Sequence, residues 1–278
     1  MAITNFIPEL WAAQMLDVWF NESVFAALVN REYEGLASRG NTVHISGVVA
    51  PTIKDYKTGV NGNARTTEAD AISDTGVDLL IDQEKSFDFY VDDIDRAQAT
   101  GTLESYTTAA GQGLTADSET FLGNLIVAGA THSTTTAIPT DGDDAFDVVR
   151  DLRKQMNKAK VPSDNRVLVV NAEFESLLLG ANSKLTAVNV SGDNNGLRNA
   201  TLGQLLSFRT VVTNYLPAVD APQAVAFNTR CVAFVSQIDQ TEGMRAQDKF
   251  ADRIRGLHVY GGKVVRPEGV IVFNPDGS

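Results

Sequence analysis

The stretch LLIDQEKSFDFYVDDIDRAQ, residues 79–98, decides the fold because its apolar residues change from the period of a β-strand to that of a helix. Within it Phe87 and Phe89 alternate with polar residues, which predicts a strand with one buried face. Beyond it, apolar residues recur mostly every three or four positions as far as Leu125, which predicts a helix of about 25 residues, weakened near Gly111. A helix of that length can span a whole domain.

The residues before this stretch predict a long two-stranded ribbon, residues 41–82. Val43 and Ile45 alternate with polar residues on the first strand, and the same alternation returns from Val77. Between the strands, residues 58–73 are polar and contain almost nothing to bury. Because an isolated two-stranded ribbon is marginally stable in water, either it folds back on its own domain or a neighbouring subunit supports it.

The N-terminal residues 6–29 predict an amphipathic helical arm. Trp11 and Trp19 fall on one apolar face, and Asn21 stands where it can cap a second short helix that carries Phe25. The arm either packs on the core of its own chain or needs a partner, since its aromatic residues would together form an apolar patch if they stayed exposed to water.

The rest of the chain has a different pattern, and a polar loop at residues 129–143 is a credible subdomain boundary. A small α/β unit is predicted after it, with a continuously apolar strand typical of a buried sheet. The predicted elements are helices at about 144–159, after Asn171 and near 200–207, strands at 166–170, 209–215, 223–228 and 231–237, and a β-rich tail at 252–273 with a break at Gly261-Gly262.

The charge balance excludes several classes of function. The chain of 278 residues has 23 basic and 35 acidic residues, a net charge of −12. A nucleic-acid-binding surface needs clustered Lys and Arg, so the balance argues against it and against docking on anionic membranes. We also expect neither a signal peptide nor a membrane span, because no basic region precedes an apolar core and no apolar run approaches roughly 18 residues.

The sequence contains no recognisable catalytic constellation. Its three histidines lie in different segments without a Cys or second His at ligand spacing, so we expect no metal and no cofactor. The single cysteine, Cys231, lies in an apolar run and is predicted to be a buried, inert thiol. The acidic clusters at 92–95 and 141–144 are best explained as helix caps or solvated loops, although the second matches a fragment of a calcium loop. We therefore expect that the protein is not an enzyme; a hydrolase or lyase with a site among Asp92, Asp93 and Asp95 is the alternative.

Four stretches together resemble one known family. They are FIPELWAAQMLDVWFNESVFAALVNREYEG (6–35), GNTVHISGVVAPTIKDY (40–56), LLIDQEKSFDFYVDDIDRAQ (79–98) and GLHVYGGKVVRPEGVIVF (256–273). Their content and order are similar to those of the Hong Kong 97-type major capsid proteins of tailed bacteriophages, over nearly the whole chain. The resemblance implies an α+β capsid fold with an N-terminal arm, an extended β-hairpin called the E-loop, a spine helix with a P-domain β-sheet, and an α/β A domain.

The resemblance also implies boundaries and contact residues. The implied boundaries are 1–39 for the N-terminal arm, 40–82 for the E-loop, 83–136 and 249–278 for the P (peripheral) domain with a spine helix at about 94–127, and 137–248 for the A (axial) domain. The residues expected at contacts between subunits are Phe6, Trp11, Trp19, Lys54, Asp55, Tyr56, Lys57 and Arg65. Some members are crosslinked through an E-loop lysine, but no Asn and Glu partner matches Lys54 or Lys57, so no crosslink is predicted.

The function implied by the resemblance is structural. Pentamers and hexamers of the chain would form an icosahedral head, assembled in the bacterial host cytoplasm, that encloses double-stranded DNA without sequence-specific binding and without a membrane. A separate scaffolding protein, a portal and a decoration protein are the expected partners. An encapsulin-like nanocompartment shell with an enzyme cargo is the nearest alternative, and a tail or adhesion protein of the same virus is another.

Overall fold

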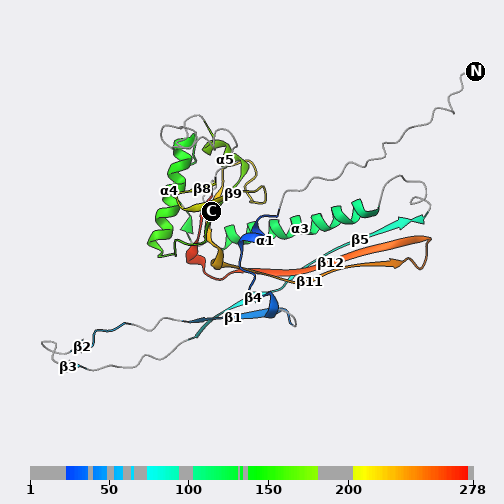
Figure 1. The fold of residues 1–278 in the computed structure, drawn as a ribbon, viewed down its shortest axis with the longest axis horizontal. Coiled ribbons are helices and arrows are strands. Elements are labelled where there is room, and N and C mark those ends of the chain that lie inside the picture. Colours follow the sequence, from blue (N-terminus) through cyan, green and yellow to red (C-terminus); the bar gives the residue numbers. More distant parts are fainter. Residues whose placement is uncertain are drawn as a thin grey trace, which may run out of the picture.

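The computed structural model describes most of the chain. The described residues are 23–36, 40–48, 53–58, 64–65, 74–93, 103–130, 132–133, 137–180 and 203–274. They form a long three-stranded sheet, a compact six-stranded sheet and a two-stranded ribbon, with a short strand pair at the far end of the ribbon's loop (Figure 1). None of the helices among these residues is long and apolar enough to cross a membrane.

A three-stranded antiparallel sheet runs along the length of the molecule. Its strands are β11 (Val232–Arg245), β12 (Ala251–Val264) and β5 (Gln83–Asp92), with β12 in the centre. The long helix α3 (Leu103–Ala128) lies along this sheet (Figure 1). The Tyr260 hydroxyl joins the two by donating to the Asp117 carboxylate at 2.7 Å. The strand–helix change predicted after residue 79 is confirmed; the part of the predicted helix at 94–102 lies outside the described residues.

A ribbon of two strands crosses the other face of this sheet. β1 (Thr42–Val48) pairs antiparallel with β4 (Asp74–Leu80), as the sequence predicts. Its apolar side packs on Val235 and Val259 of the sheet, while Tyr260, the next residue of β12, belongs to the core under α3. Because successive side chains of a strand point to opposite faces, the sheet is enclosed at this level between α3 and the root of the ribbon.

The six-stranded sheet forms the second body of the molecule. Its order is β6 (His132–Ser133), β13 (Val270–Phe273), β10 (Ala224–Asn228), β7 (Arg166–Val170), β9 (Phe208–Val212) and β8 (Gln204–Leu205). Alternate residues of its central strands enter two different cores. On one face they pack with α4 (Gly142–Lys158) and α5 (Ala172–Leu178), and on the other with the end of α3. Short 3-10 turns lie at Thr229–Cys231 and Pro267–Gly269.

The N-terminal described segment attaches to both sheet and helix. It consists of α1 (Phe25–Leu28) and a 3-10 turn, Glu34–Leu36. The N-cap residue of α1 is Val24, whose side chain makes no capping bond, and the carboxylate of Glu119 on α3 accepts the free amides instead. The predicted cap Asn21 and the first helix of the arm lie outside the described residues.

Two sequence predictions are wrong. The described part of the expected helix near 200–207 is β8 and a tight turn, where Leu206 and Ser207 adopt positive φ values of 47° and 69°. β12 also runs through Gly261-Gly262 without a break. A Cβ at Gly261 would lie 2.1 Å from the Leu80 carbonyl oxygen, so the glycine allows the ribbon to approach closely instead of ending the strand.

The strand pairing also crosses two of the expected domain limits. Residues 232–245, which the resemblance assigns to the A domain, pair with β12 in the three-stranded sheet. Residues 270–273, placed in the P domain, pair with β10 in the six-stranded sheet. One apolar core joins Leu122 and Tyr260 to Val225 and Val270, so side chains of both regions pack together.

Candidate functional site: surfaces for subunit contact

The described part of the ribbon's loop, here called the loop tip, comprises residues 53–58 and 64–65. Ile53 is 99% exposed and Tyr56 58% exposed, although both have large apolar parts. Lys54 and Asp55 beside them are exposed as well. Such side chains contribute nothing to a core of their own chain and are available to a neighbour.

Two short strands lie at the far end of the loop tip. β2 (Lys57–Thr58) pairs antiparallel with β3 (Ala64–Arg65), and Lys57 stands opposite Arg65. Figure 1 shows this pair far from both sheets. The structure thus brings five of the expected contact residues onto one extended segment: Lys54, Asp55, Tyr56, Lys57 and Arg65. Phe6, Trp11 and Trp19 lie outside the described residues.

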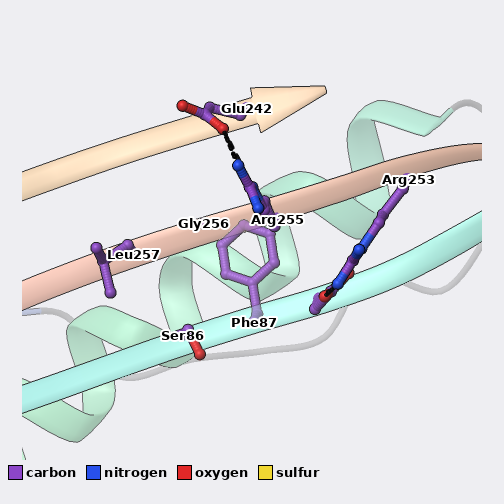
Figure 2. A pocket seen from close by; sticks show the side chains of 8 residues that line it. Ser86, Phe87, Glu242, Arg253, Arg255, Gly256 and Leu257 are labelled. Atoms are coloured by element: carbon purple, nitrogen blue, oxygen red, sulfur yellow. Dashed lines mark hydrogen bonds and ion pairs between the residues drawn. The ribbon is translucent and has the colours of Figure 1, made fainter. Parts of the chain in front are cut away.

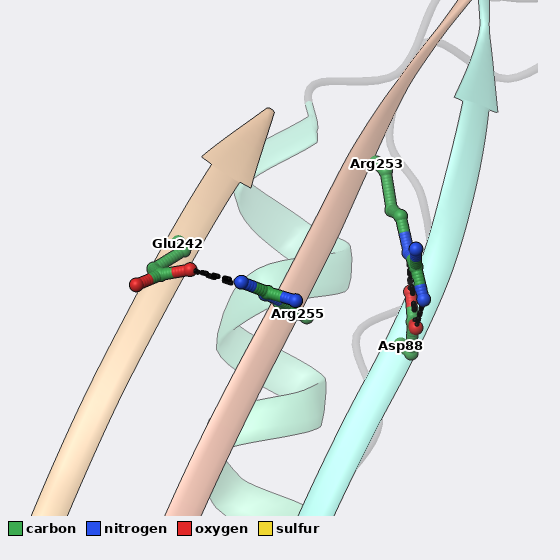
Figure 3. Close-up of polar contacts among 4 residues, drawn as sticks. All are labelled: Asp88, Glu242, Arg253 and Arg255. Carbon is green, nitrogen blue, oxygen red and sulfur yellow. Dashed lines mark hydrogen bonds and ion pairs between the residues drawn. The ribbon is translucent and has the colours of Figure 1, made fainter. Parts of the chain in front are cut away.

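A second surface was not predicted from the sequence. It is the part of the three-stranded sheet that faces away from α3 and is not covered by β1 and β4, and it is here called the outer sheet face. It carries Asp88, Tyr90, Glu242, Arg253, Arg255 and Leu257. Arg253 forms a bidentate pair with Asp88 across β12 and β5, and Arg255 donates to Glu242 across β12 and β11 at 2.7 Å (Figure 3). These two pairs link all three strands.

The electrostatics of the outer sheet face follow from these pairs. The Arg253 guanidinium donates to Asp88, which lowers the pKa of that carboxyl, and the same bond raises the pKa of Arg253. The Arg253 guanidinium also lies 5.5 Å from the Tyr90 ring centroid, and the Lys249 ammonium lies at 5.5 Å from the same ring. Exposed ion pairs contribute little stability individually, but bidentate geometry orients the groups for recognition.

A shallow groove of about 300 Å³ opens between the two ion pairs (Figure 2). Phe87 and Gly256 contribute to its lining, and Ser86 and Leu257 stand at one end. A Cβ on Gly256 would lie 2.2 Å from the Phe87 ring, so this glycine makes room for the aromatic side chain opposite it. The sequence signal for this face is the alternation of Arg253 and Arg255 along one strand, which places both on the same side.

The distal end of the three-stranded sheet exposes apolar side chains. Phe250 in the β11–β12 turn is 81% exposed, Tyr90 52% and Met244 38%. Arg245 bonds Asp93 and Asp252 beside them. Asp93 was expected to cap the long helix; in the structure it accepts a bond from Arg245 and so connects the end of β5 to the β11–β12 turn.

The remaining chemical candidates are structural groups. Asp141 is the N-cap of α4 and accepts the Asp144 amide at 2.9 Å, which confirms the capping prediction for this cluster. Cys231 is buried as predicted, and burial raises the pKa of its thiol. Within the described ranges, no group of three or more His, Cys, Asp or Glu residues is placed to hold a metal ion.

Comparisons with known proteins give one consistent picture. A family model described as "Phage capsid protein" matches residues 76–273. The chain is 55% identical to a solved chain from "Mycobacterium phage Che8", with a TM-score of 0.91 and 100% of each chain covered. No curated protein matches the sequence.

Two more distant structures show the same fold. "Capsid structure of the Cyanophage P-SCSP1u" is 15% identical with a TM-score of 0.80, covering 98% of this chain and 94% of that one. "Asymmetric unit of bacteriophage PhiM1 mature capsid" is 15% identical with a TM-score of 0.76, covering 96% and 91%.

Proposed function

The chain belongs to the phage capsid proteins and is a major capsid protein of the tailed-phage type with a Hong Kong 97-like α+β fold, and from this premise we propose how it builds its shell. Pentamers and hexamers of the chain close into an icosahedral head around double-stranded DNA, in the host cytoplasm. Identical subunits form such a head through heterologous contacts that close into rings. The chain acts by contact alone, without a catalytic step.

The observation that carries the proposal is the exposed loop tip. A pair of two-residue strands is too small to be stable without support. Ile53 and Tyr56 beside it are more than half exposed in the single chain. In the shell, the loop tip lies on an adjacent subunit, which covers these side chains and supports β2 and β3.

Each expected region of the chain occupies a different position in this shell. The six-stranded sheet with α4 and α5, most of which lies in the proposed A domain, meets its copies around the five-fold and six-fold axes. The three-stranded sheet and α3 lie at the periphery; β5, β12 and α3 belong to the proposed P domain. The arm with Phe6, Trp11 and Trp19 lies across a neighbour. The core shared by the two regions supports their movement as one body.

We propose three further partners. A separate scaffolding protein guides closure, a portal occupies one vertex, and a decoration protein binds the finished surface. The net charge of −12 supports enclosure of DNA without adhesion, since carboxylates and phosphates repel each other.

Substitution at the loop tip tests the proposal. Tyr56→Ala should leave the melting temperature of the free subunit within about 1 °C, because an exposed side chain contributes little to folding, and should reduce the yield of closed particles. Thr120→Ala is the control, because Thr120 is exposed on α3 and its hydroxyl bonds its own helix at Ala116. Particle yield is measured by sedimentation and negative-stain microscopy.

Deletion of residues 60–72 extends this test. The variant should fold as a subunit yet fail to close shells. Normal shells from both the deletion and Tyr56→Ala would remove the loop tip from the subunit interface.

A further inference from the structure

Glu119 is a buried carboxylate in the middle of α3. Its side chain has 0% exposure, which is rare for a glutamate unless it is fully hydrogen bonded. Both of its oxygens are occupied, and each accepts two bonds. Oε1 accepts from the Ser23 hydroxyl at 2.7 Å and the Ala26 amide at 2.9 Å, and Oε2 accepts from the Val24 and Phe25 amides at 2.9 and 2.7 Å.

These bonds cap a helix in another part of the sequence. The first amides of a helix lack partners within the helix and are usually capped by a side chain just before it. In α1 the N-cap Val24 provides no such side chain. The acceptor instead comes from α3, 93 to 96 positions along the chain. This contact between Glu119 and residues 23–26, here called the anchor, is therefore a tertiary contact. It forms only when residues 23–26 lie on α3.

The same segment is attached to the three-stranded sheet a few residues later. The Asn30 amide donates to the Val232 carbonyl at 2.9 Å, and the Asn30 carbonyl accepts from the Phe234 amide at 3.0 Å. Within the first attachment Phe25 is fully buried against α3, where a Cβ on Gly123 would lie 3.4 Å from its ring. Residues 23–34 are thus held at one end by the helix and at the other by the sheet.

We propose that Glu119 is the positioning residue for the N-terminal arm: by binding residues 23–26 it fixes the point and direction at which the arm leaves α3. This inference deepens the proposed function, because it rests on the arm being a contact element of the shell. Each arm then starts from the same place on each subunit, so that identical contacts repeat around the shell. Hydrophobic burial of Phe25 alone would hold the segment without setting its direction, since the hydrophobic effect is not directional.

The four bonds to Glu119 predict that even a nearly isosteric substitution weakens the attachment of residues 23–26. Glu119→Gln is nearly isosteric, but its amide nitrogen donates and would face two donors where a carboxylate oxygen accepted them. With the nitrogen at the Oε2 position, the bonds from the Val24 and Phe25 amides are both lost. With the nitrogen at the Oε1 position, the bond from the Ala26 amide is lost, while the Ser23 hydroxyl can rotate and accept. Either orientation leaves at least one backbone amide facing another donor. Ser23→Ala removes one donor and leaves the carboxylate bonded to all three amides, so it should act in the same direction and more weakly.

Hydrogen exchange of the free subunit is the first part of the test. In Glu119→Gln the amides of Val24, Phe25 and Ala26 should exchange at least about tenfold faster, in keeping with the loss of charge-assisted bonds. The amides of β12 should keep their wild-type rates. The control is Thr120→Ala on the same helix, whose hydroxyl bonds only its own helix at Ala116. Unchanged exchange at residues 24–26 in Glu119→Gln would overturn the anchor.

Assembly of the same variants is the second part. Glu119→Gln should yield irregular or incomplete particles, while Thr120→Ala should assemble like the wild type. Regular particles of wild-type diameter from a variant with fast exchange at residues 24–26 would overturn the positioning role. Failure of the wild-type chain to form particles or rings even with a scaffolding protein added would refute the proposed function, while the exchange measurement would still decide whether the anchor exists.

Discussion

The substitution Gly261→Ala tests the close crossing of the ribbon over β12. A Cβ at this position would lie 2.1 Å from the Leu80 carbonyl oxygen and 2.8 Å from the Ile81 Cα. Cβ atoms essentially never come closer than 3.0 Å to another heavy atom, so β12 and the residues at Leu80 must separate by at least 0.9 Å, the difference between 3.0 and 2.1 Å. Both obstacles are backbone atoms and cannot rotate away.

The expected cost follows from this geometry. Overpacking a well-packed site costs about 1–3 kcal/mol, and a backbone obstacle places Gly261→Ala at the upper end of that range. The melting temperature should fall by roughly 4–10 °C, because about 1 kcal/mol shifts it by 2–4 °C in a chain of this size.

Two other glycines of the three-stranded sheet provide matched controls. A Cβ on Gly262 would meet the Leu125 Cδ2 at 2.9 Å, and that methyl is the end of a side chain that can rotate. Gly262→Ala should therefore cost about 1 kcal/mol or less. Gly243 has no atom within 4 Å of its Cβ position, so Gly243→Ala should change stability by less than about 0.5 kcal/mol.

Thermal and urea unfolding measure the relative stabilities of the three variants. We expect Gly261→Ala to be the least stable, followed by Gly262→Ala and then Gly243→Ala. A Gly261→Ala protein as stable as Gly243→Ala would show that the ribbon does not cross β12 at the described distance.

Three further predictions concern single side chains. Arg253 lowers the pKa of Asp88, so Asp88→Asn should destabilise the subunit at pH 7, and the difference from wild type should vanish as the pH falls below 3.8 and through the lowered pKa; urea midpoints at several pH values measure it. Burial raises the pKa of the Cys231 thiol, so a thiol reagent should label it only at the rate of unfolding; rapid labelling of the native subunit would contradict this. Asp141→Ala removes the cap of α4 and should cost about 0.5–2 kcal/mol in urea unfolding, whereas the neighbouring Asp143→Ala should cost less.

The elements that the sequence predicts well are those with a clear local period. Phe87 and Phe89 alternate along β5, and the apolar residues of α4 recur at helical spacing, so each local pattern agrees with the final packing. The fully buried strand β7 was likewise predicted from a continuous apolar run.

The failures come from contacts between distant segments. Glycine pairs usually interrupt a strand, but Gly261 and Gly262 continue β12 because the ribbon and α3 press on its two faces. Glu119 looks like any polar residue of a helix, and only the tertiary structure brings residues 23–26 to it. The pairing of residues 232–245 with β12 was not predicted for the same reason, since the partner of a strand depends on the fold and not on its neighbours in sequence.

The residues expected at subunit contacts stay a prediction. Lys54, Tyr56 and Arg65 were inferred from the resemblance, and their exposure in the single chain agrees with an interface but does not test it. The outer sheet face was missed because its paired charges, such as Arg255 and Glu242, lie 13 positions apart and meet only across strands.

The most direct test of the central claim is light scattering coupled to size-exclusion chromatography of the purified chain, followed by electron microscopy of the largest fraction. We expect closed particles, or rings of five and six subunits, and co-purified DNA would distinguish a phage head from a cargo shell. A monomer of 29.9 kDa that remains a monomer at high concentration, and with a scaffolding protein added, would contradict it.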